Sequence, residues 1–256
     1  MSNKIESEER YKEENILNFN SLDTKIYRIF SIEHFKDLLK SKELVLVNPA
    51  KKLDDPFENF FLKTEVVLPD GIKTKLDDLQ NKWYVQCWTY KKESDALWRI
   101  YSPCKNGVRV STTARKLFDS IYNENEDLPF LRYFVGNVNY IPQKEIEDFL
   151  TGSSFWDIAA GGSNNNFAKL LCIKRPEFDH EEEVRILVND INGNIGDGEL
   201  YRIPFEIENV FDDVCLDPRY NDVEYKKIKK EIEDLGCNLP ISQSQLYKLT
   251  ITQIRL

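Results

Sequence analysis

The sequence predicts a single α+β domain built around a mixed or antiparallel sheet. Apolar runs of strand length alternate with segments whose apolar residues recur at helical spacing. Short turns rich in Pro, Gly, Asn and Asp separate these runs. The chain shows no internal repeat and no composition shift that would mark a linker between domains. We therefore expect a polar N-terminal arm over residues 1–24, followed by one domain over residues 25–256.

The chain is long enough and apolar enough to bury a sizeable core. Its 256 residues are 41% hydrophobic and 12% aromatic, and a chain of this length buries about 70% of its extended surface on folding. Such a composition excludes disorder over the whole length. No apolar run approaches the roughly 18 residues that a membrane helix needs, and residues 1–14 lack the apolar stretch of a secretory signal. We expect a soluble protein with no membrane partner.

Composition also narrows the chemistry. The five cysteines form no CxxC motif and, without a secretory signal, favour free thiols in the reducing cytoplasm. His34 and His180 are the only histidines, so we expect no metal site. The net charge of −9 argues against a protein that coats nucleic acid through bulk electrostatics. It leaves open an enzyme that touches nucleic acid in a local groove.

The first predicted unit of the domain is strand–helix–strand. Residues 25–30 alternate between polar and apolar side chains, as a short strand does. Ser31 offers its hydroxyl as the N-cap of a helix that continues to Leu39. A second strand over residues 43–47 ends at Asn48-Pro49.

Further strands and helices follow along the chain. We expect strands at 83–90, 107–113, 131–141, 180–188 and 199–205, and helices at 96–101, 114–122, 143–150 and 167–174. A last helix over 225–235 should end at Gly236. The Gly-, Ser- and Asn-rich stretch 151–166 fits either a disordered linker or a loop over a site.

Arg28 is the first candidate site residue. An arginine inside a half-buried strand has five N–H donors to satisfy, and a phosphate or carboxylate ligand would satisfy them. A structural ion pair with a nearby acid would satisfy them as well. The residue type and its place on the strand leave both interpretations open.

Hydroxyl side chains end the strand at 107–113. Ser111 and Thr112 could order a neighbouring carboxylate or bind a ligand amide. Threonine is also common in strands because β-branched side chains fit a pleated surface. The motif alone does not decide between these two interpretations.

Acidic and apolar residues alternate over Glu181–Val188. Strand periodicity puts Glu181, Glu183 and Arg185 on one face and apolar residues on the face toward the core. Two carboxylates this close make each other harder to ionise. They form either a solvated edge paired with Arg185 or a site where a carboxylate engages a cationic intermediate.

Other catalytic motifs are absent from the sequence. It contains no GxSxG, no catalytic cysteine signature, no GxGxxG after a strand and no P-loop. The acidic segment Asp54–Glu58 lacks the spacing of a calcium loop, so we expect a Pro-braced turn there. The lysines at 226–230 are expected to form a solvated helix face.

The order of motifs resembles a widespread bacterial family of unknown function. Its members share a Tyr-Arg strand, an Asn-Asp-Pro-Phe-Glu turn, a Trp-x-x-Tyr segment with a Gly-Val strand, a Glu-x-Glu-x-Arg strand and a Ser-x-Leu-Tyr segment. The counterparts here are Tyr27-Arg28, Asp54–Glu58, Trp98–Tyr101 with Gly107-Val108, Glu181–Arg185 and Ser244–Tyr247. Two departures are Asp54, where Asn is usual, and Ser111-Thr112, where the strand end is usually more apolar.

A second resemblance implies an activity. Arginine on the first strand, Ser-Thr at a strand end and Glu-x-Glu on a later strand follow the order of ADP-ribosyltransferases of the arginine–serine–glutamate type. The opening strand–helix–strand is similar to that of the DNA-modifying toxins in this group. The resemblance implies a sheet split in two and NAD as the substrate. It implies that Arg28 holds the NAD phosphate or ribose, that Ser111 positions the catalytic acid, and that Glu183 is this acid.

The same resemblance implies two groups of binding residues. The residues expected to bind NAD are Tyr27, Arg28, Trp98, Tyr101, Ser111 and Thr112. The residues expected to bind the acceptor are Glu181, Phe178 and His180. Phe178 and His180 come from the turn before the acidic strand, and Glu181 comes from the start of that strand.

The function that we expect is a cytoplasmic NAD-dependent ADP-ribosyltransferase, either a toxin or an anti-phage effector. Its acceptor would be a nucleic acid, RNA included, or a protein, and the resemblance also implies an antitoxin partner. Cleavage of the nicotinamide–ribose bond builds positive charge on the ribose, which a fixed carboxylate stabilises. Two alternatives stay open: NAD hydrolysis at the same site, and a non-catalytic binding module in which Arg28, Glu183 and Arg185 form a salt-bridge network.

Overall fold

The computed structural model describes residues 14–53, 55–58, 65–67, 71, 73–75, 82–123, 132–151, 164–193 and 195–249. Its strands are β1 (Ile16–Leu17), β2 (Lys25–Ser31), β3 (Glu43–Val47), β4 (Glu65–Val67), β5 (Lys73–Lys75), β6 (Trp83–Thr89), β7 (Gly107–Thr113), β8 (Tyr133–Asn137), β9 (Asn139–Tyr140), β10 (Ile173–Lys174), β11 (Glu183–Asn189), β12 (Leu200–Pro204), β13 (Asp213–Leu216) and β14 (Ile241–Gln243). Its helices are α2 (Ile32–Ser41), α3 (Pro49–Lys52), α6 (Asp95–Tyr101), α7 (Ala114–Ile121), α9 (Gln143–Thr151), α11 (Asn164–Leu170), the 3₁₀ helix η1 (Pro176–Glu181), α12 (Ile207–Val210) and α13 (Asp222–Asp234). None of these helices has the length and apolarity that crossing a bilayer requires.

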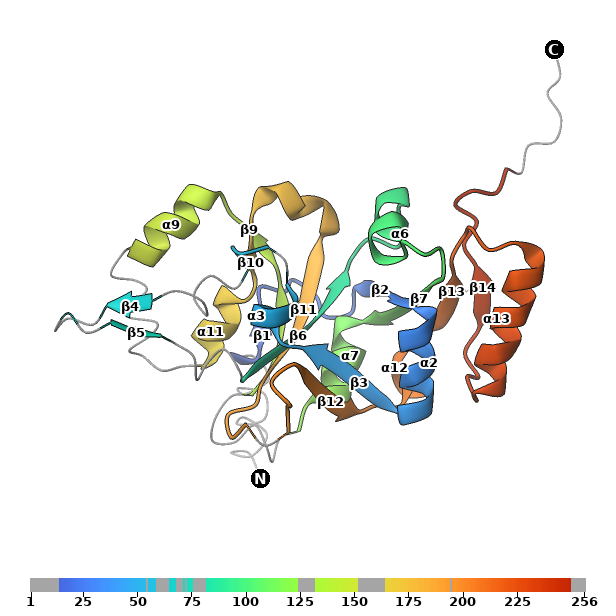
Figure 1. Ribbon diagram of the computed structural model, residues 1–256, viewed down its shortest axis with the longest axis horizontal. Helices are drawn as coiled ribbons and strands as arrows, with labels where there is room; N and C mark the ends of the chain where they lie inside the picture. Colours follow the sequence, from blue (N-terminus) through green and yellow to red (C-terminus); the bar gives the residue numbers. More distant parts are fainter. Residues whose placement is uncertain are drawn as a thin grey trace, which may run out of the picture.

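One large mixed sheet forms the centre of the molecule (Figure 1). Its strand order is β1-β8-β11-β6-β2-β7-β13-β14, and β3 joins β6 while β12 joins β3. Most neighbours are antiparallel, but β1 runs parallel to β8 and β13 runs parallel to β14. The predicted α+β class with a mixed sheet and flanking helices is confirmed.

The sheet divides in two at β6. One edge of β6 pairs with β11 along its whole length. On the other edge, β2 meets β6 only through Tyr27 and Thr89, and β3 meets it only through Val47 and Val85. Neither strand pairs with the stretch of β6 around Cys87 that lies between these two points. The expected split of the sheet is therefore present, and it leaves a gap at the middle of β6.

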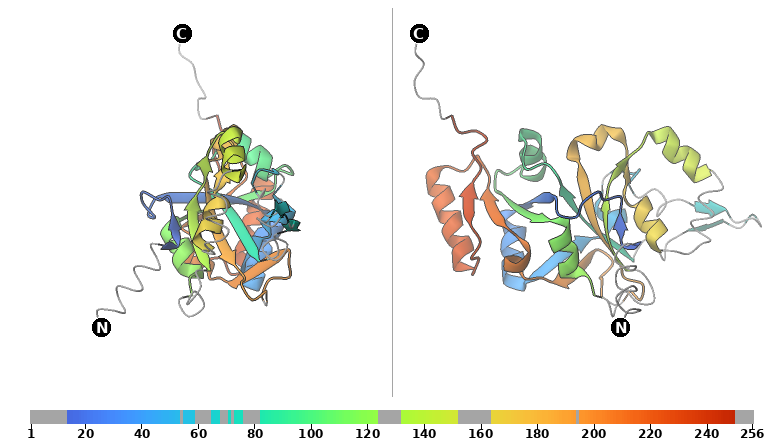
Figure 2. Two further views of the ribbon diagram at one scale, coloured as in Figure 1. Left: turned by 90° about the vertical axis from the view of Figure 1, so that its left-hand side faces the viewer. Right: turned by 180° about the vertical axis from the view of Figure 1, so that it is seen from behind.

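Helices flank the central sheet (Figure 2), and apolar residues fill both of its faces. One cluster joins the sheet to α2, α7, α12 and α13 and contains Trp88 and Phe118. The other joins it to α9 and α11 and contains Trp83 and Phe134. Neighbouring residues of β6 thus face opposite clusters, as the alternation of side chains along a strand requires.

Local capping follows the sequence. The Ser31 side chain accepts a hydrogen bond from the backbone N–H of His34 and so begins α2, as predicted. Thr113, the last residue of β7, accepts from the backbone N–H of Lys116 and begins α7 in the same way. Beyond α13 the chain turns at Gly236, whose φ of +90° is in the region that favours glycine. The predicted helix end at Gly236 is confirmed.

Part of the segment predicted as an N-terminal arm contributes to the sheet. Ile16–Leu17 pair with β8, and the Leu17 side chain is buried. Residues 1–13 lie outside the described residues, so the division at residue 24 stays a prediction. Residues 152–163 of the Gly- and Asn-rich stretch also lie outside them, and Asn164 opens α11. The choice between linker and loop for this stretch therefore also stays a prediction.

The predicted strand 180–188 begins later than expected. Residues up to Glu181 form η1, Glu182 has a positive φ of 44°, and β11 starts at Glu183. Pro176 opens η1, because its fixed φ suits the first position of a helical turn. Glu181 therefore does not lie on a strand face with Glu183, which corrects that prediction. Every residue of β11 is buried, which excludes the solvated edge as well.

Candidate active site

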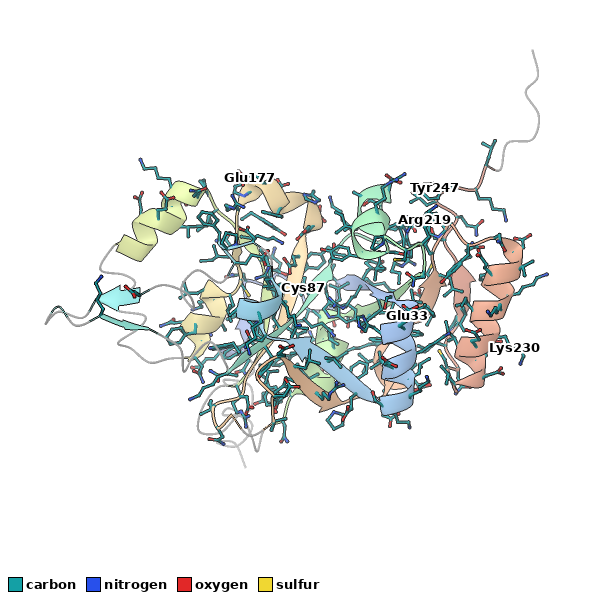
Figure 3. All side chains as sticks on the ribbon, in the orientation of Figure 1. Glu33, Cys87, Glu177, Arg219, Lys230 and Tyr247 are labelled. Carbon is teal, nitrogen blue, oxygen red and sulfur yellow. The ribbon has the colours of Figure 1, made fainter. Side chains whose placement is uncertain are left out.

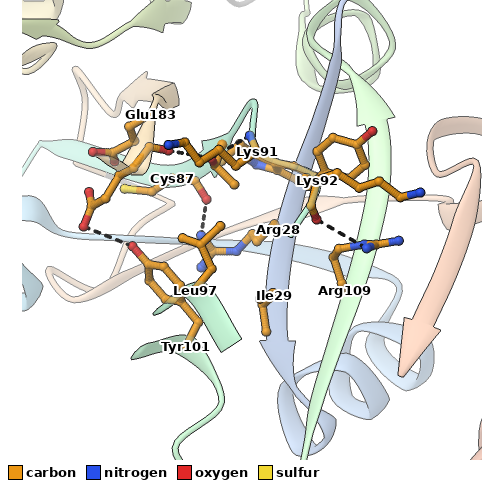
Figure 4. A pocket seen from close by; sticks show the side chains of 13 residues that line it. Arg28, Ile29, Cys87, Lys91, Lys92, Leu97, Tyr101, Arg109 and Glu183 are labelled. Carbon is orange, nitrogen blue, oxygen red and sulfur yellow. Dashed lines mark hydrogen bonds between the residues drawn. The ribbon is translucent and has the colours of Figure 1, made fainter. Parts of the chain in front are cut away.

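The split in the sheet opens into a pocket beside β6 (Figure 4). Arg28 of β2 fills the gap, and its Nη1 donates to the backbone carbonyl of Cys87. Leu97 and Tyr101 of α6 form another wall. A second pocket extends from the first toward the acidic turn and η1. We call the two together the split-sheet cleft, because both are lined by Arg28, Cys87, Tyr101, Glu181 and Glu183.

The cleft is large enough for a nucleotide-sized ligand. Its two parts have cavity volumes of ≈ 40 and ≈ 580 Å³, and the larger part is the one beside the acidic turn and η1. Ligand pockets of proteins typically enclose roughly 300–1,000 Å³. The position of the cleft at a break between two halves of a sheet also gives it walls of rigid strands.

Arg28 is a half-buried cation that forms no ion pair with any other described residue. Its Nε has no hydrogen-bond partner in this part of the chain, and the ring of Phe30 lies 5.1 Å from the guanidinium carbon. Burial lowers the pKa of Arg28, because the charged form has lost hydration. The structural ion pair that was one interpretation of this residue is not seen among the described residues. The free donors of Arg28 suit a phosphate or carboxylate ligand.

An ionic cluster of five side chains borders the cleft, and four of them line it. It consists of Glu58, Lys174, Glu181, Glu183 and Arg185. Arg185 donates to Glu183 at two points, Nε to Oε1 and Nη2 to Oε2, both at 2.9 Å, and it also contacts Glu58. The Lys174 Nζ lies 2.5 Å from Glu181, 3.1 Å from Glu58 and 3.4 Å from Glu183. Three carboxylates and two cations leave one net negative charge.

Glu183 stays ionised inside this cluster. Its side chain is only 5% exposed, and burial alone would raise its pKa. The charges of Arg185 and Lys174 and the hydrogen bonds from Arg185 outweigh burial and lower the pKa of Glu183 to about 2. A carboxylate that is always negative and rigidly held can stabilise positive charge that develops in a ligand.

Glu181 is more open to the cleft than Glu183. Its Oε2 accepts from Lys174 at 2.5 Å, whereas its Oε1 has one long contact among the described residues, 3.4 Å to the hydroxyl of Tyr101. Burial and the charge of Glu181 raise the pKa of Tyr101, so this phenol remains a donor at neutral pH. Glu181 is therefore the carboxylate of the cluster with capacity to accept a further hydrogen bond or a proton.

The turn at Asp55–Glu58 holds the cluster in place. Asp55 accepts two hydrogen bonds from Arg175, at 3.1 and 3.3 Å. The ring of Phe57 packs 4.5 Å from the guanidinium carbon of the same arginine. Glu58 reaches both cations of the cluster. Asp54 lies outside the described residues. The acidic turn therefore positions the cluster through cations from β10 and β11.

Cations line the side of the cleft away from the cluster. Lys92 follows β6, and Arg109 comes from β7. Lys91 also lines the pocket, but its ammonium pairs with Glu182 at 3.3 Å, next to the cluster. The guanidinium carbon of Arg109 lies 5.4 Å from the ring centre of Tyr27, which also lines the pocket. The cleft thus has a basic wall and an acidic wall, so it complements a ligand that carries an anionic group and a cationic group at separate places.

Ser111 does not meet Arg28 and Glu183 in the cleft, contrary to the prediction. It is fully buried, lies opposite Tyr27 in the sheet, and donates to the carboxylate of Asp213. Strands β2 and β6 separate β7 from β11, so Arg185 and Lys174 hold Glu183 instead. The pairing between strands decides which side chains are neighbours in the sheet, and a linear motif does not show this pairing.

Two other predicted NAD-binding residues also lie away from the cleft. Thr112 donates to the backbone carbonyl of Val210 at 2.6 Å and is fully buried. Trp98 is fully buried too, and its indole N–H donates to Glu93 at 3.0 Å. Both act in packing, because the alternation of β7 and the inner face of α6 turn them toward the core.

The remaining predicted binding residues are mostly brought together. Those that line the cleft are Tyr27, Arg28, Tyr101, Glu181 and Phe178. The Phe178 ring lies 4.6 Å from the Lys174 ammonium. His180 is exposed at the end of η1. The direct roles of all these residues in binding stay predictions.

Several residues of the site have no motif that sequence reasoning recognised. Lys174 was expected at the end of a helix, but it forms β10 beside β9. Arg109 lies two positions before Ser111 on the same strand, so the two side chains share one face. This spacing of two residues is the sequence signal that could have drawn attention to Arg109. Cys87 contributes its backbone carbonyl, which no side-chain motif can indicate.

Comparison with protein families gives one match. A family described as a protein of unknown function (DUF2971) matches residues 97–186, which run from within α6 through β7 to the start of β11. No curated protein matches the chain.

Similar solved structures include DarT from Thermus sp. 2.9 in three complexes. The complex with NAD⁺ has a TM-score of 0.41 and 13% sequence identity over 89% of this chain and 98% of that chain. The complex with ADP-ribosylated single-stranded DNA has a TM-score of 0.41 and 13% identity over 87% and 95%. The complex with carba-NAD⁺ has a TM-score of 0.39 and 14% identity over 88% and 97%.

Proposed function

We propose that this chain is an NAD-dependent ADP-ribosyltransferase that binds NAD in the split-sheet cleft. One observation carries the proposal: Arg28, a cation with no acidic partner among the described residues, faces a cleft whose opposite wall holds the ionised carboxylate of Glu183. NAD has the matching charges, because its diphosphate is anionic and its nicotinamide ring is cationic.

The acidic wall suits the bond cleavage. When the bond between the nicotinamide nitrogen and the ribose carbon breaks, both electrons leave with nicotinamide and positive charge spreads over the ribose. Glu183 is negative before and after this step, and it stabilises the charged transition state more than the ground state. Arg185 and Lys174 fix the carboxylate, so it does not need to reorient during the reaction.

Glu181 takes the second role. An acceptor nucleophile attacks the ribose carbon from the face that nicotinamide does not cover, and its proton must leave as the new bond forms. The loosely bonded Oε1 of Glu181, beside the Tyr101 hydroxyl, is the available acceptor for that proton. Tyr27 and Phe178 provide aromatic surfaces at the two ends of the cleft for NAD and the acceptor.

The acceptor is a nucleic acid or a protein, and the activity would serve a toxin or anti-phage effector kept in check by an antitoxin. The net charge of −9 favours a short, local contact with a nucleic acid over an extended one. If no acceptor is bound, water at the same place would make the enzyme an NAD glycohydrolase.

The non-catalytic alternative has an observation in its favour. Glu183 and Arg185 do form a buried ionic network with Glu58 and Lys174. Arg28, however, makes no ion pair with these residues, although all line or border the same cleft. A purely structural network does not explain why Arg28 lines the cleft without an acidic partner among the described residues.

The test is incubation of the purified protein with NAD labelled in the adenylate part, with nicotinamide release and label transfer measured separately. We expect the wild type to release nicotinamide. We also expect it to transfer the label when oligonucleotides or a protein extract are added as acceptor. Glu183→Gln should lower release by at least about 100-fold, while circular dichroism confirms that it folds. Wild-type protein that releases no nicotinamide with either acceptor would overturn the proposal.

A further inference from the structure

A second guanidinium of the basic wall has unused hydrogen-bonding capacity. Arg109 is only 4% exposed, and its Nε has no hydrogen-bond partner among the described residues. Its one hydrogen bond in this part of the chain runs from Nη1 to the backbone carbonyl of Lys92, at 3.3 Å. A guanidinium has five N–H donors, and leaving them unsatisfied in a buried place costs free energy.

The two carboxylates nearest to Arg109 are engaged elsewhere. Glu93 lies 3.5 Å from it, but its Oε2 accepts from Trp98 at 3.0 Å and from Ser244 at 2.5 Å. The Oδ1 of Asp213 lies 3.8 Å from it, and the other carboxylate oxygen, Oδ2, accepts a hydrogen bond from Ser111. Charge-assisted hydrogen bonds normally measure about 2.7–2.9 Å. Both contacts of Arg109 with these acids are therefore longer than a charge-assisted hydrogen bond.

Other arginines of the chain show what a structural guanidinium looks like here. Arg219 donates to Asp217 at 2.6 and 2.8 Å, to the Ser102 carbonyl at 2.6 Å and to the Trp98 carbonyl at 3.0 Å. Arg185 is bonded on all sides within the ionic cluster. Among the described residues, Arg28 and Arg109 alone combine an unpartnered Nε with a place in the wall of the cleft.

Arg109 stands where the cleft meets a second hollow. A groove between β14 and α13 is lined by Arg109 and Lys92, and these two residues also line the cleft. Lys226 and Lys248 add positive charge farther along the groove, against Glu93 and Asp222. An anion bound at Arg109 would therefore lie between the cleft and the groove, at a place different from the gap that Arg28 fills.

We propose that Arg109 and Lys92 form a second anion-binding subsite, separate from Arg28, which takes a phosphate group of a nucleotide. This phosphate belongs either to the adenylate half of the dinucleotide or to a nucleotide acceptor. The assignment of these two sources rests on the proposed function, whereas the subsite itself does not, because it can bind a phosphate without any turnover.

Binding measurements without catalysis test the subsite. We would titrate the protein with AMP and with inorganic pyrophosphate by calorimetry, using Arg109→Gln, Arg109→Lys, Lys92→Gln and Arg28→Gln. Arg109→Gln should weaken AMP binding about tenfold or more, and Lys92→Gln, on the surface, should weaken it several-fold. The control Arg115→Gln removes an exposed cation of α7 that is paired with Asp23, and it should leave AMP binding unchanged.

Two outcomes would overturn the subsite. The first is AMP affinity in Arg109→Gln and Lys92→Gln equal to that of the control, with folding verified by circular dichroism. The second is a loss in Arg28→Gln equal to that in Arg109→Gln, which would mean one shared anion site. Should Arg109→Gln fail to fold, Arg109→Lys and Lys92→Gln decide the question in its place, because the first keeps the charge and the second lies on the surface.

Kinetics then identify the source of the phosphate. A KM for NAD that rises in Arg109→Gln while kcat is kept assigns the phosphate to the dinucleotide. An unchanged KM for NAD with a raised KM for an oligonucleotide acceptor assigns it to the acceptor. Failure of the proposed function remains distinguishable, because a chain that binds AMP through Arg109 but releases no nicotinamide retains the subsite and loses the enzyme.

Discussion

Arg28 and Glu183 line one cleft although they come from strands that are not neighbours in the sheet. β6 lies between β2 and β11, but β2 leaves β6 after a single residue pair. The side chain of Arg28 can therefore turn toward the face that carries Glu183. This meeting of a guanidinium and an ionised carboxylate around an empty space is the geometry on which the proposed chemistry depends (Figure 3 shows the surrounding side chains).

Arg28 and Arg185 should respond differently to loss of charge. Arg28→Gln should change the free energy of unfolding by less than about 1 kcal/mol, because no described acid depends on it. It should raise the KM for NAD by about 10- to 100-fold. Arg185→Gln should lower stability by about 3–5 kcal/mol, because it strands Glu58 and Glu183 in a buried place. Urea unfolding and NAD titrations measure both; equal destabilisation by the two variants would contradict this account of Arg28.

Glu183 should make stability depend on acid pH. Its pKa is about 2 in the folded chain against 4.5 for an ordinary glutamate, so its contribution is present above pH 4.5 and is lost as pH falls toward 2. The contribution amounts to up to about 3 kcal/mol by linkage. We expect the stability difference between wild type and Glu183→Gln to shrink over this range. A difference that stays constant from pH 6 to pH 3 in urea unfolding would refute the ion-pair origin of the shift.

Glu181 and Glu183 should separate transfer from cleavage. Glu181→Gln should lower label transfer by about 100-fold, because the acceptor proton loses its base. It should lower nicotinamide release much less, because Glu183 still stabilises the ribose cation. Parallel assays of release and transfer measure the ratio. Equal loss of the two reactions in Glu181→Gln would assign both steps to one carboxylate or exclude the proposed division.

Glu58 should act on the site through the two cations that it holds. Glu58→Gln removes one negative charge from the cluster and leaves Lys174 and Arg185 with fewer partners. We expect a loss of about 2–4 kcal/mol in stability and a lower kcat with little change in the KM for NAD. Asp55→Asn, which loosens Arg175 instead, is the matched control and should affect kcat less. A KM effect larger than the kcat effect would argue that Glu58 touches the ligand.

Ser111 should matter to stability and not to chemistry. Ser111→Ala removes a buried hydrogen bond to Asp213 and should destabilise the chain by about 1–3 kcal/mol. Nicotinamide release per folded molecule should stay within about threefold of wild type. A loss of release as large as that of Glu183→Gln, in a folded variant, would restore the role that the motif order first suggested for Ser111.

The sequence was informative wherever local chemistry decides structure. Period-2 and helical spacing identified most strands and helices, and Ser31 and Gly236 marked the ends of helices because caps act over one turn. The same reasoning failed at Glu181, because the strand pattern over 180–188 does not show that the turn begun at Pro176 continues through Glu182. The same reasoning placed Lys174 in a helix. Lys174 pairs instead with β9, and because β9 lies much earlier in the chain, local spacing does not show this pairing.

The sequence by itself determined the α+β class, the position of Arg28 on the first strand of the domain, and a segment with enough acidic residues to form a site. Only tertiary structure decided which of these side chains meet. Strand order put β2 and β6 between Ser111 and Glu183 and removed Ser111 from the cleft. The early parting of β2 and β3 from β6 created the cleft itself. Such neighbours are set by pairing between distant segments, and the free energy of that pairing depends on the whole sheet and its core, which no short motif contains.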